Sequence, residues 1–510
     1  MNQLKIGVVL NYLIITLNIV IGLVYTPFLL KMLGQSEYGM YSLAQSVITY
    51  LVILDLGFGN AVIRYTAKFR AESKTREAES LFGMFLLIYG VIGIVAFIAG
   101  TAITMNLDLF FSNTMTTSEL KTIKTMLWLM TFNVVFTFPM SIWGNIMTAY
   151  ERFAFLRLVR IATQIANPLA MFVLLLMGHK AISLVVLTTI LNVITLLFNF
   201  WYCSHYLKIH IRFDHFDLSL LREVGIYALW IFVSAIVDRF QWYTGQFVLG
   251  IYHGTSAIAI YALAIQLVTF YMMFSTAISS VFLPKVTKIV TTGNDIEQVS
   301  NLFLRTGRIQ YVIMALVLSG YIVFGQQFIY LWVGPDYSDS FFIALLLMIP
   351  LTVPLIQNLG LSVLEARNKM RFRALLYFSI ALVALAVSFP LAKYYQGIGT
   401  ALATMGAMFV GHVLIMNIYY YRAQKIDIPL FWKNIIRMSI APFFLVVASL
   451  FVLSYFHLYA NTWSKLFGQI AMYLVTYFVV VWFLSLNVSE RMLFSTPIKK
   501  IVNRFCNTND

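Results

Sequence analysis

A series of long apolar segments constrains the fold of this chain more than any other feature. A helix of about 20 apolar residues crosses a bilayer core of about 30 Å, and fourteen such segments follow one another with short connections. Of the 510 residues, 61% are hydrophobic and only 11% are charged, whereas about a quarter of the residues in a soluble protein are charged. The sequence therefore predicts an all-α polytopic membrane protein.

The predicted transmembrane segments are helices because only helices and closed barrels satisfy their own backbone groups in lipid. The first segment follows the N-terminal residues without a small-residue cleavage site, so we expect an uncleaved anchor. The predicted spans are 9–30, 40–63, 81–104, 123–146, 158–178, 182–203, 226–249, 257–281, 310–332, 341–363, 374–392, 398–420, 436–456 and 466–487.

Positive charge is concentrated on one side of this predicted topology. Most of the 35 Lys and Arg residues fall in the N-terminal segment, the C-terminal tail and the connections that follow even-numbered spans. Because Lys and Arg are enriched in cytoplasmic loops, we expect both termini to be cytoplasmic. The net charge of +15 then reflects topology and attraction to anionic lipid, and no nucleic-acid partner is expected.

The sequence also contains an internal repeat. The segment GQSEYGMYSLAQSVITY, which begins at Gly34, aligns with GTSAIAIYALAIQLVTF, which begins at Gly254. A similar shift places Lys208 on Lys425. Repeats that each contain an even number of spans cross the membrane in the same sense, related by an axis along the membrane normal. Chance similarity between apolar segments is the alternative explanation.

This repeat predicts two six-helix bundles related by pseudo-two-fold symmetry, with a cleft between them, and two extra C-terminal helices. The expected N-lobe holds helices 1–6 within residues 1–210, and the expected C-lobe holds helices 7–12 within residues 211–425. Helices 13 and 14 then occupy residues 426–490, and residues 491–510 form a cytoplasmic tail.

Ionisable residues well inside the predicted spans are candidates for function, because a charge at the centre of a membrane helix costs about 2.5–3.5 kcal/mol. Asp55, Asp238 and Arg239 are the three in this sequence. Arg239 is suited to binding phosphate through its planar guanidinium. Asp55 and Asp238 are candidates for a coupled proton or Na⁺ site. A structural salt bridge, for instance between Asp55 and an arginine, is the alternative.

Polar residues recur at helical spacing in three predicted spans, and each series forms one face of its helix. Such a face either lines a cleft or forms hydrogen bonds between helices within one bundle. Arg64, at the cytoplasmic end of span 2, either meets the substrate or anchors the span at the membrane surface. The candidate cleft residues are Asn18, Gln45, Gln241 and Trp242.

Other chemical motifs are weak. The glycines of GFG at 57–59 lack the strand and the remainder of a phosphate-binding loop, and close helix packing explains them better. Cys203 and Cys506 fall on the predicted cytoplasmic side, so no disulfide framework is indicated. We find no catalytic triad, nucleotide motif or metal-ligand cluster in the sequence. We therefore expect no enzymatic activity, no metal and no cofactor.

Four segments carry a family resemblance along nearly the whole chain. They are KMLGQSEYGMYSL (31–43), LDLGFGNAVIRYTAKFR (54–70), YALAIQLVTF (261–270) and LWVGPDYSDS (331–340). In this order, and with fourteen spans, they resemble the oligosaccharide flippases of the polysaccharide-transport family. That family includes the O-antigen flippases and belongs to the multidrug/oligosaccharidyl-lipid/polysaccharide exporter superfamily.

The resemblance implies a transporter for a polyprenyl-diphosphate-linked oligosaccharide, which moves from the cytoplasmic to the periplasmic leaflet of a bacterial inner membrane by alternating access. It implies a role in lipopolysaccharide or other polysaccharide biosynthesis, with the polysaccharide polymerase machinery as an expected partner. Arg64 and Arg239 would then meet the diphosphate, and the four candidate cleft residues would meet the sugars. Family members often have a cationic cavity, whereas here two aspartates accompany Arg239, which favours coupling to H⁺ or Na⁺.

The sequence is also compatible with three other functions. A drug or metabolite exporter of the related MATE type would share the fold and would also need intramembrane acids. A flippase for a lipid-linked cell-wall precursor is a closer relative. A membrane polymerase or ligase would be expected to carry catalytic groups in a large outer loop, and the longest predicted outer loop, about 105–122, contains none.

Overall fold

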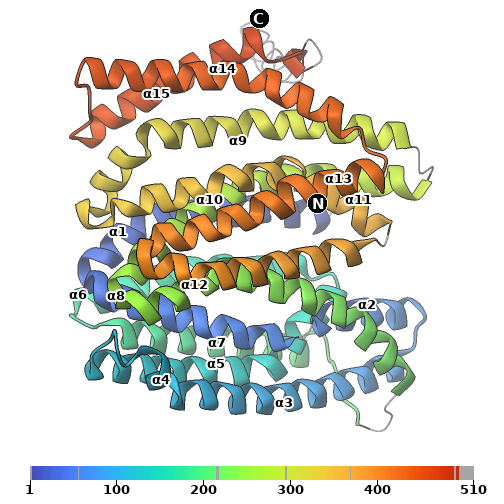
Figure 1. Ribbon diagram of the computed structural model, residues 1–510. Helices are drawn as coiled ribbons and strands as arrows, with labels where there is room; N and C mark the ends of the chain where they lie inside the picture. Colours follow the sequence, from blue (N-terminus) through green and yellow to red (C-terminus); the bar gives the residue numbers. More distant parts are fainter. Residues whose placement is uncertain are drawn as a thin grey trace, which may run out of the picture. The chain divides into compact units, whose positions relative to one another are not determined.

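The computed structural model describes residues 3–55, 57–213, 218–292, 296–367, 369–487 and 490–492. Within these ranges the chain consists of helices and their connections, and no strand occurs in them (Figure 1). The predicted all-α class is therefore confirmed.

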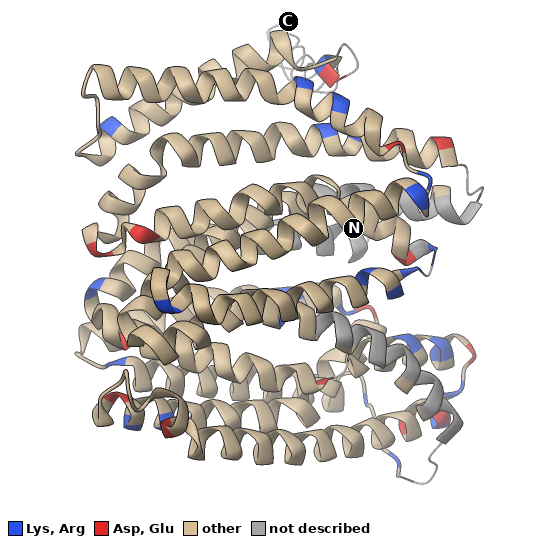
Figure 2. Cartoon of the chain, in the orientation of Figure 1, with Lys and Arg blue, Asp and Glu red and all other residues tan. Residues whose placement is uncertain are grey.

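Eleven helical segments in the described ranges are long and apolar enough to cross a membrane. Three of the eleven contain an internal turn, at Gly34, Gly254 and Gln396, and so consist of two helices each. Counting both helices at each turn gives the predicted fourteen. Charged residues gather at helix ends and in the connections, whereas the middles of the helices are largely uncharged (Figure 2).

The turns repeat in the two halves of the sequence. Gly34 has φ 77° and ψ 171°, and Gly254 has φ 74° and ψ −162°, a conformation that is essentially restricted to glycine. Lys208 and Lys425, the second aligned pair, also share a positive φ, at 51° and 59°. Matching backbone conformations at aligned positions support the duplication that the sequence predicts.

Backbone hydrogen bonds around the second pair match as well. The N–H of Ile209 donates to the carbonyl of Cys203 at 3.2 Å, and the N–H of Ile426 donates to the carbonyl of Tyr420 at 3.1 Å. Both bonds close the same type of turn after a helix end. The chain therefore leaves the last helix of each repeat in the same conformation.

By its internal contacts the chain divides into two compact units, each described separately here. Unit 1 comprises Met1–Ile265 and Arg371–Ala407, and unit 2 comprises Gln266–Met370 and Met408–Asp510. The lobe boundaries expected near residues 210 and 425 stay predictions.

The first seven helices belong to unit 1, and two long segments, α8 and α12, run from one unit into the other. The elements of unit 1 are α1 (Gln3–Val52), η1 (Ile53–Asp55), α2 (Phe58–Ala71), α3 (Thr75–Met105), α4 (Leu107–Phe111), α5 (Thr117–Ala149), α6 (Phe153–Leu176) and α7 (Ala181–His205). The shared segments are α8 (Leu218–Thr292) and α12 (Met370–Met408). The remaining helices of unit 2 are α9 (Ile296–Val333), η2 (Pro335–Tyr337), α10 (Asp339–Ile356), α11 (Asn358–Ala366), η3 (Phe409–Ile415), α13 (Met416–Arg422), α14 (Ile428–Tyr455) and α15 (Trp463–Leu484).

Helix α5 is the central element of unit 1, since it packs against α1, α2, α3 and α7. It begins with a capping box, in which Thr116 and Glu119 each bind the backbone N–H of the other. The Glu119 carboxylate also accepts hydrogen bonds from Ser36 at 2.7 Å and Thr255 at 3.0 Å. One side chain thus holds the start of α5 beside the turns at Gly34 and Gly254.

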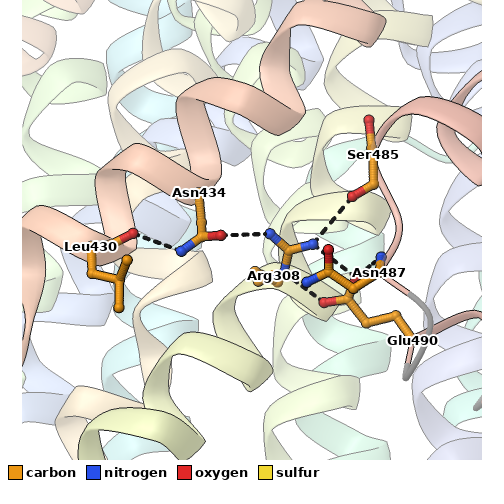
Figure 3. A network of polar contacts seen from close by, with 6 residues as sticks. All are labelled: Arg308, Leu430, Asn434, Ser485, Asn487 and Glu490. Carbon is orange, nitrogen blue, oxygen red and sulfur yellow. Dashed lines mark hydrogen bonds and ion pairs between the residues drawn. The ribbon is translucent and has the colours of Figure 1, made fainter.

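In unit 2, a buried ion pair connects α9 to the segment that follows α15 (Figure 3). Arg308 donates from Nε to Glu490 Oε1 at 2.6 Å and from Nη2 to Oε2 at 2.8 Å. Its Nη1 donates to Asn434 Oδ1 on α14 at 3.0 Å, and its Nη2 also donates to the Ser485 carbonyl at 3.1 Å. The side chains of the ion pair are only 8% and 5% exposed, so this network holds α14 and α15 against α9.

Candidate substrate cavities in unit 1

The candidate site begins at a break in the second predicted span. The segment 40–63 is not one unbroken helix, because α1 ends at Val52, one 3₁₀ turn runs from Ile53 to Asp55, and α2 begins at Phe58. Gly57 precedes α2 with φ 72° and ψ 14°, near the left-handed region that costs other residues about 1–2 kcal/mol. Its N–H donates to the Asp55 carboxylate, a local bond with which aspartate favours a turn over a helix.

Beside this break lies a cavity of about 440 Å³, which we call the first cavity. Residues from the break and the start of α2 form one wall, and α5 and α8 form the others. The described lining residues are Val52, Ile53, Asp55, Gly57, Gly59, Asn60, Thr137, Phe138, Ser141, Asn145, Phe232 and Arg239.

Two charged residues of opposite sign face the first cavity from different helices. Asp55 is half-buried, and the buried hydroxyl of Tyr89 on α3 is close enough to interact with its carboxylate. Arg239 projects from α8, with its guanidinium carbon 5.7 Å from the centre of the Tyr243 ring, within cation–π range. The cavity therefore offers both a cationic group that can bind phosphate and a carboxylate that can hold a cation or proton.

A row of polar side chains on α5 completes the first cavity. Thr137, Ser141 and Asn145 are spaced four residues apart and lie on one face of the helix. At Gly59 the backbone of α2 comes so near this face that an added Cβ would lie 2.9 Å from Asn145 Nδ2. The second glycine of GFG therefore permits close packing, as predicted, whereas the first forms the turn.

A second cavity of about 320 Å³ lies among α1, α6 and α7. Its polar residues follow i, i+4, i+7 spacing on both α6 and α7, so each helix presents one polar face to it. Eight of its nine described lining residues are polar; the nine are Asn18, Arg160, Thr163, Gln164, Asn167, Thr188, Leu191, Asn192 and Thr195.

Hydrogen bonds between α7 and α5 form a wall that the two cavities share. Asn192, which lines the second cavity, donates to Thr137 Oγ1 at 2.8 Å and to Asn133 Oδ1 at 2.7 Å. Thr137 itself lines the first cavity. The polar face of α5 is thus shared between the two cavities.

The structure brings together some of the residues that the sequence singled out. Asp55 and Arg239 line the first cavity, and Asn18 lines the second. Gln45 instead donates to the Tyr41 hydroxyl one turn earlier in α1 at 3.2 Å, a bond within one helix, and it is not among the described lining residues of either cavity.

The other candidates lie elsewhere on the same helices. Arg64 is exposed on α2, with its guanidinium 5.8 Å from the Tyr65 ring, and is not among the described lining residues of either cavity. Gln241 and Trp242 are half-buried on α8 and are likewise absent from those lining residues. The side chain of Asp238 lies outside the described part of the chain.

The sequence interpretation missed the polar faces of α5, α6 and α7. Their signal was present, because polar residues recur every three or four positions in otherwise apolar segments, as in Arg160, Gln164 and Asn167. These faces consist mainly of amides and hydroxyls, which stand out less in a membrane helix than an ionisable residue does.

Comparison with known proteins shows the family. Residues 4–290 match a family model described as "Polysaccharide biosynthesis protein". The chain belongs to this polysaccharide biosynthesis protein family. It is also 22% identical over 412 residues to a "Putative O-antigen transporter" from Shigella flexneri, covering 77% of this chain and 92% of that protein.

Solved structures show the same fold at low sequence identity. A "Lipid II flippase MurJ" in an inward closed conformation matches with a TM-score of 0.71 and 16% identity, covering 93% of this chain and 97% of the other. An inward-facing "multidrug resistance MATE family transporter of the MOP superfamily" matches with a TM-score of 0.64 and 13% identity, covering 82% and 95%. This member of the polysaccharide biosynthesis family therefore has a transporter fold, as the sequence predicted.

Proposed function

We propose that this protein moves a polyprenyl-diphosphate-linked oligosaccharide from the cytoplasmic to the periplasmic leaflet of a bacterial inner membrane. The observation that carries the proposal is the first cavity, where Arg239 and polar side chains face a partly open space among membrane-spanning helices. Such a space can shelter a polar headgroup while the lipid tail stays in the bilayer. Family membership and similarity to an O-antigen transporter support the same substrate class.

In this mechanism, Arg239 binds the diphosphate through charge-assisted hydrogen bonds, which the guanidinium fork can make to two oxygens at once. Thr137, Ser141 and Asn145 supply neutral hydrogen bonds from α5. The cavity opens alternately to the two sides of the membrane, and both termini lie in the cytoplasm according to the positive-inside rule.

Asp55 gives the proposed cycle a site for coupling. A carboxylate beside a bound diphosphate would repel it, so occupancy of Asp55 by H⁺ or Na⁺ favours substrate binding and release of that ion disfavours it. Asp238 is a second candidate for this role. The exported unit would then pass to the polysaccharide polymerase machinery.

The test is complementation of a strain that lacks this gene and its surface polysaccharide. Wild-type protein is expected to restore the polymer, and Arg239→Ala is expected to abolish it at an unchanged level of membrane protein. Arg422→Ala, which removes an exposed arginine at the end of α13, serves as the matched control and should complement fully. Full polymer with Arg239→Ala would overturn the assignment of the diphosphate to Arg239.

A second candidate is favoured by one observation. The first cavity contains a carboxylate as well as a cation, and a MATE-type exporter of cationic drugs would need such an acid. Loss of drug resistance without loss of surface glycan on gene deletion would favour the exporter. Loss of cell-wall precursor export would instead favour a precursor flippase.

A further inference from the structure

We infer that the second cavity is a subsite for the carbohydrate part of the substrate, separate from the site of its diphosphate. This inference rests on the proposed function, since it divides one lipid-linked oligosaccharide between two cavities. At about 320 Å³, the second cavity falls at the lower end of the range for small-molecule sites. It suits a small part of an oligosaccharide rather than a long chain.

The chemistry of the lining favours a neutral, hydroxyl-rich ligand. Four amides and three threonine hydroxyls face the space, and none of its nine described lining residues is a carboxylate. An amide offers both donors and acceptors, which matches sugar hydroxyl groups, whereas a lining with no described carboxylate and with the positive charge of Arg160 disfavours a cation. Arg160, the one charged residue in the described lining, would add a bond to a uronic acid or another acidic substituent.

One side chain in this cavity has an unused hydrogen-bonding atom. Asn167 Oδ1 is buried and has no hydrogen-bond partner among the described residues. Buried polar atoms are usually paired, so this acceptor, on a side chain that lines a polar cavity, is available to a donor from outside the chain. A sugar hydroxyl group supplies that donor.

A hydrogen bond between lining residues connects the second cavity to the first. Asn192 faces the second cavity and donates to Thr137 of the first at 2.8 Å. A substrate whose diphosphate lies at Arg239 therefore meets side chains of α5 that are bonded to the lining of the second cavity. The carbohydrate is the polar part of the substrate that remains to be accommodated.

The deciding variant is Asn167→Leu, in the full-length protein in nanodiscs. Leucine is close to asparagine in size and removes an acceptor oxygen that has no partner among the described residues, so a purely structural role predicts no loss of binding. Asn199→Leu is the matched control, because Asn199 on α7 is buried with an Oδ1 that also has no partner among the described residues, and it does not line the cavity.

Two probes separate the subsites. One is the lipid-linked oligosaccharide extracted from cells that lack the gene, and the other is polyprenyl diphosphate without sugar. We expect Asn167→Leu to weaken binding of the first probe by about threefold to tenfold, the effect of one lost neutral hydrogen bond, and to leave the second unchanged. Arg239→Ala should weaken both probes, and Asn199→Leu should weaken neither.

The outcomes distinguish this inference from the proposed function. If the wild-type protein binds both probes and Asn167→Leu binds them with the same affinities, the carbohydrate subsite is overturned. The proposed flippase function is then unaffected. Equal weakening of both probes, or an altered Na⁺ dependence with unaltered lipid binding, would also overturn it. If wild-type protein binds neither probe and gene deletion leaves the surface glycan intact, the proposed function itself fails.

Discussion

Gly34 and Gly254 adopt nearly the same backbone conformation, with φ 77° and 74°, at the two turns where the repeats align. Their surroundings differ, however. A Cβ at Gly34 would meet nothing within 4 Å, whereas a Cβ at Gly254 would lie 2.8 Å from the carbonyl oxygen of Thr114.

This difference predicts unequal effects of the same substitution. Gly34→Ala should cost about 1–3 kcal/mol through backbone strain alone, and Gly254→Ala should cost more because it adds a clash with backbone. Thermal unfolding of the purified variants in detergent tests the order. A Gly254→Ala protein as stable as the wild type would contradict it.

The pair of Arg308 and Glu490 predicts a marked loss of stability when one partner is removed. Arg308→Leu leaves a buried carboxylate without its counter-ion, which typically costs 3–5 kcal/mol in other proteins. The double variant Arg308→Leu/Glu490→Leu removes both charges and should be closer to the wild type. Denaturation of the single and double variants under the same conditions measures the difference in stability between them. Equal losses of stability in the two variants would argue that the residues do not act as a pair.

The same pair predicts how acid affects unit 2. Burial opposes ionisation of Glu490, but hydrogen bonds from Arg308 and from the Asn487 N–H outweigh it and hold the pKa of Glu490 below its ordinary value of 4.5. Because the folded pKa is lowered, this contribution to stability is fully present above about pH 4.5 and is lost as the pH falls through the folded pKa. Thermal stability measured from pH 7 downward should show an acid-induced decline that is smaller in Glu490→Gln. An identical decline in both proteins would exclude Glu490 as its source.

Asp55→Asn tests the coupling role. Asparagine keeps the size and an acceptor oxygen for the Gly57 N–H but cannot carry a negative charge or release a proton. We expect residual transport that no longer responds to a proton or Na⁺ gradient, measured by flipping of lipid-linked oligosaccharide in proteoliposomes. If transport by Asp55→Asn still depends fully on the gradient, a residue other than Asp55 couples transport to the ion.

Gly59 controls the distance between α2 and α5 beside the first cavity. A Cβ there would lie 2.9 Å from Asn145 Nδ2, so Gly59→Ala should push Asn145 out of place and cost about 1–3 kcal/mol, as overpacking does. Transport should fall accordingly. Gly90→Ala on α3 is the control, since its Cβ would meet nothing within 4 Å, and comparable defects in the two variants would point to a general helix effect.

Part of the site could be predicted from sequence because intramembrane charge is costly wherever it occurs. That argument selected Asp55 and Arg239, and both line the first cavity. The same argument could not select Asn167 or Asn192, because amides occur in many helix interfaces where they bond only to one another. An amide can also bond within its own helix, as Gln45 does to Tyr41.

The sequence by itself determined the number of helices, the repeat and the family, because hydropathy and the backbone freedom of glycine are local properties. Tertiary structure decided which polar faces meet. The break at Asp55–Gly57 and the packing of α5 between α2 and α7 place two polar spaces on either side of one wall, shared by Thr137 and Asn192. Whether polar faces of different helices meet depends on how the helices rotate and cross. Side-chain packing along the whole length of the helices sets both.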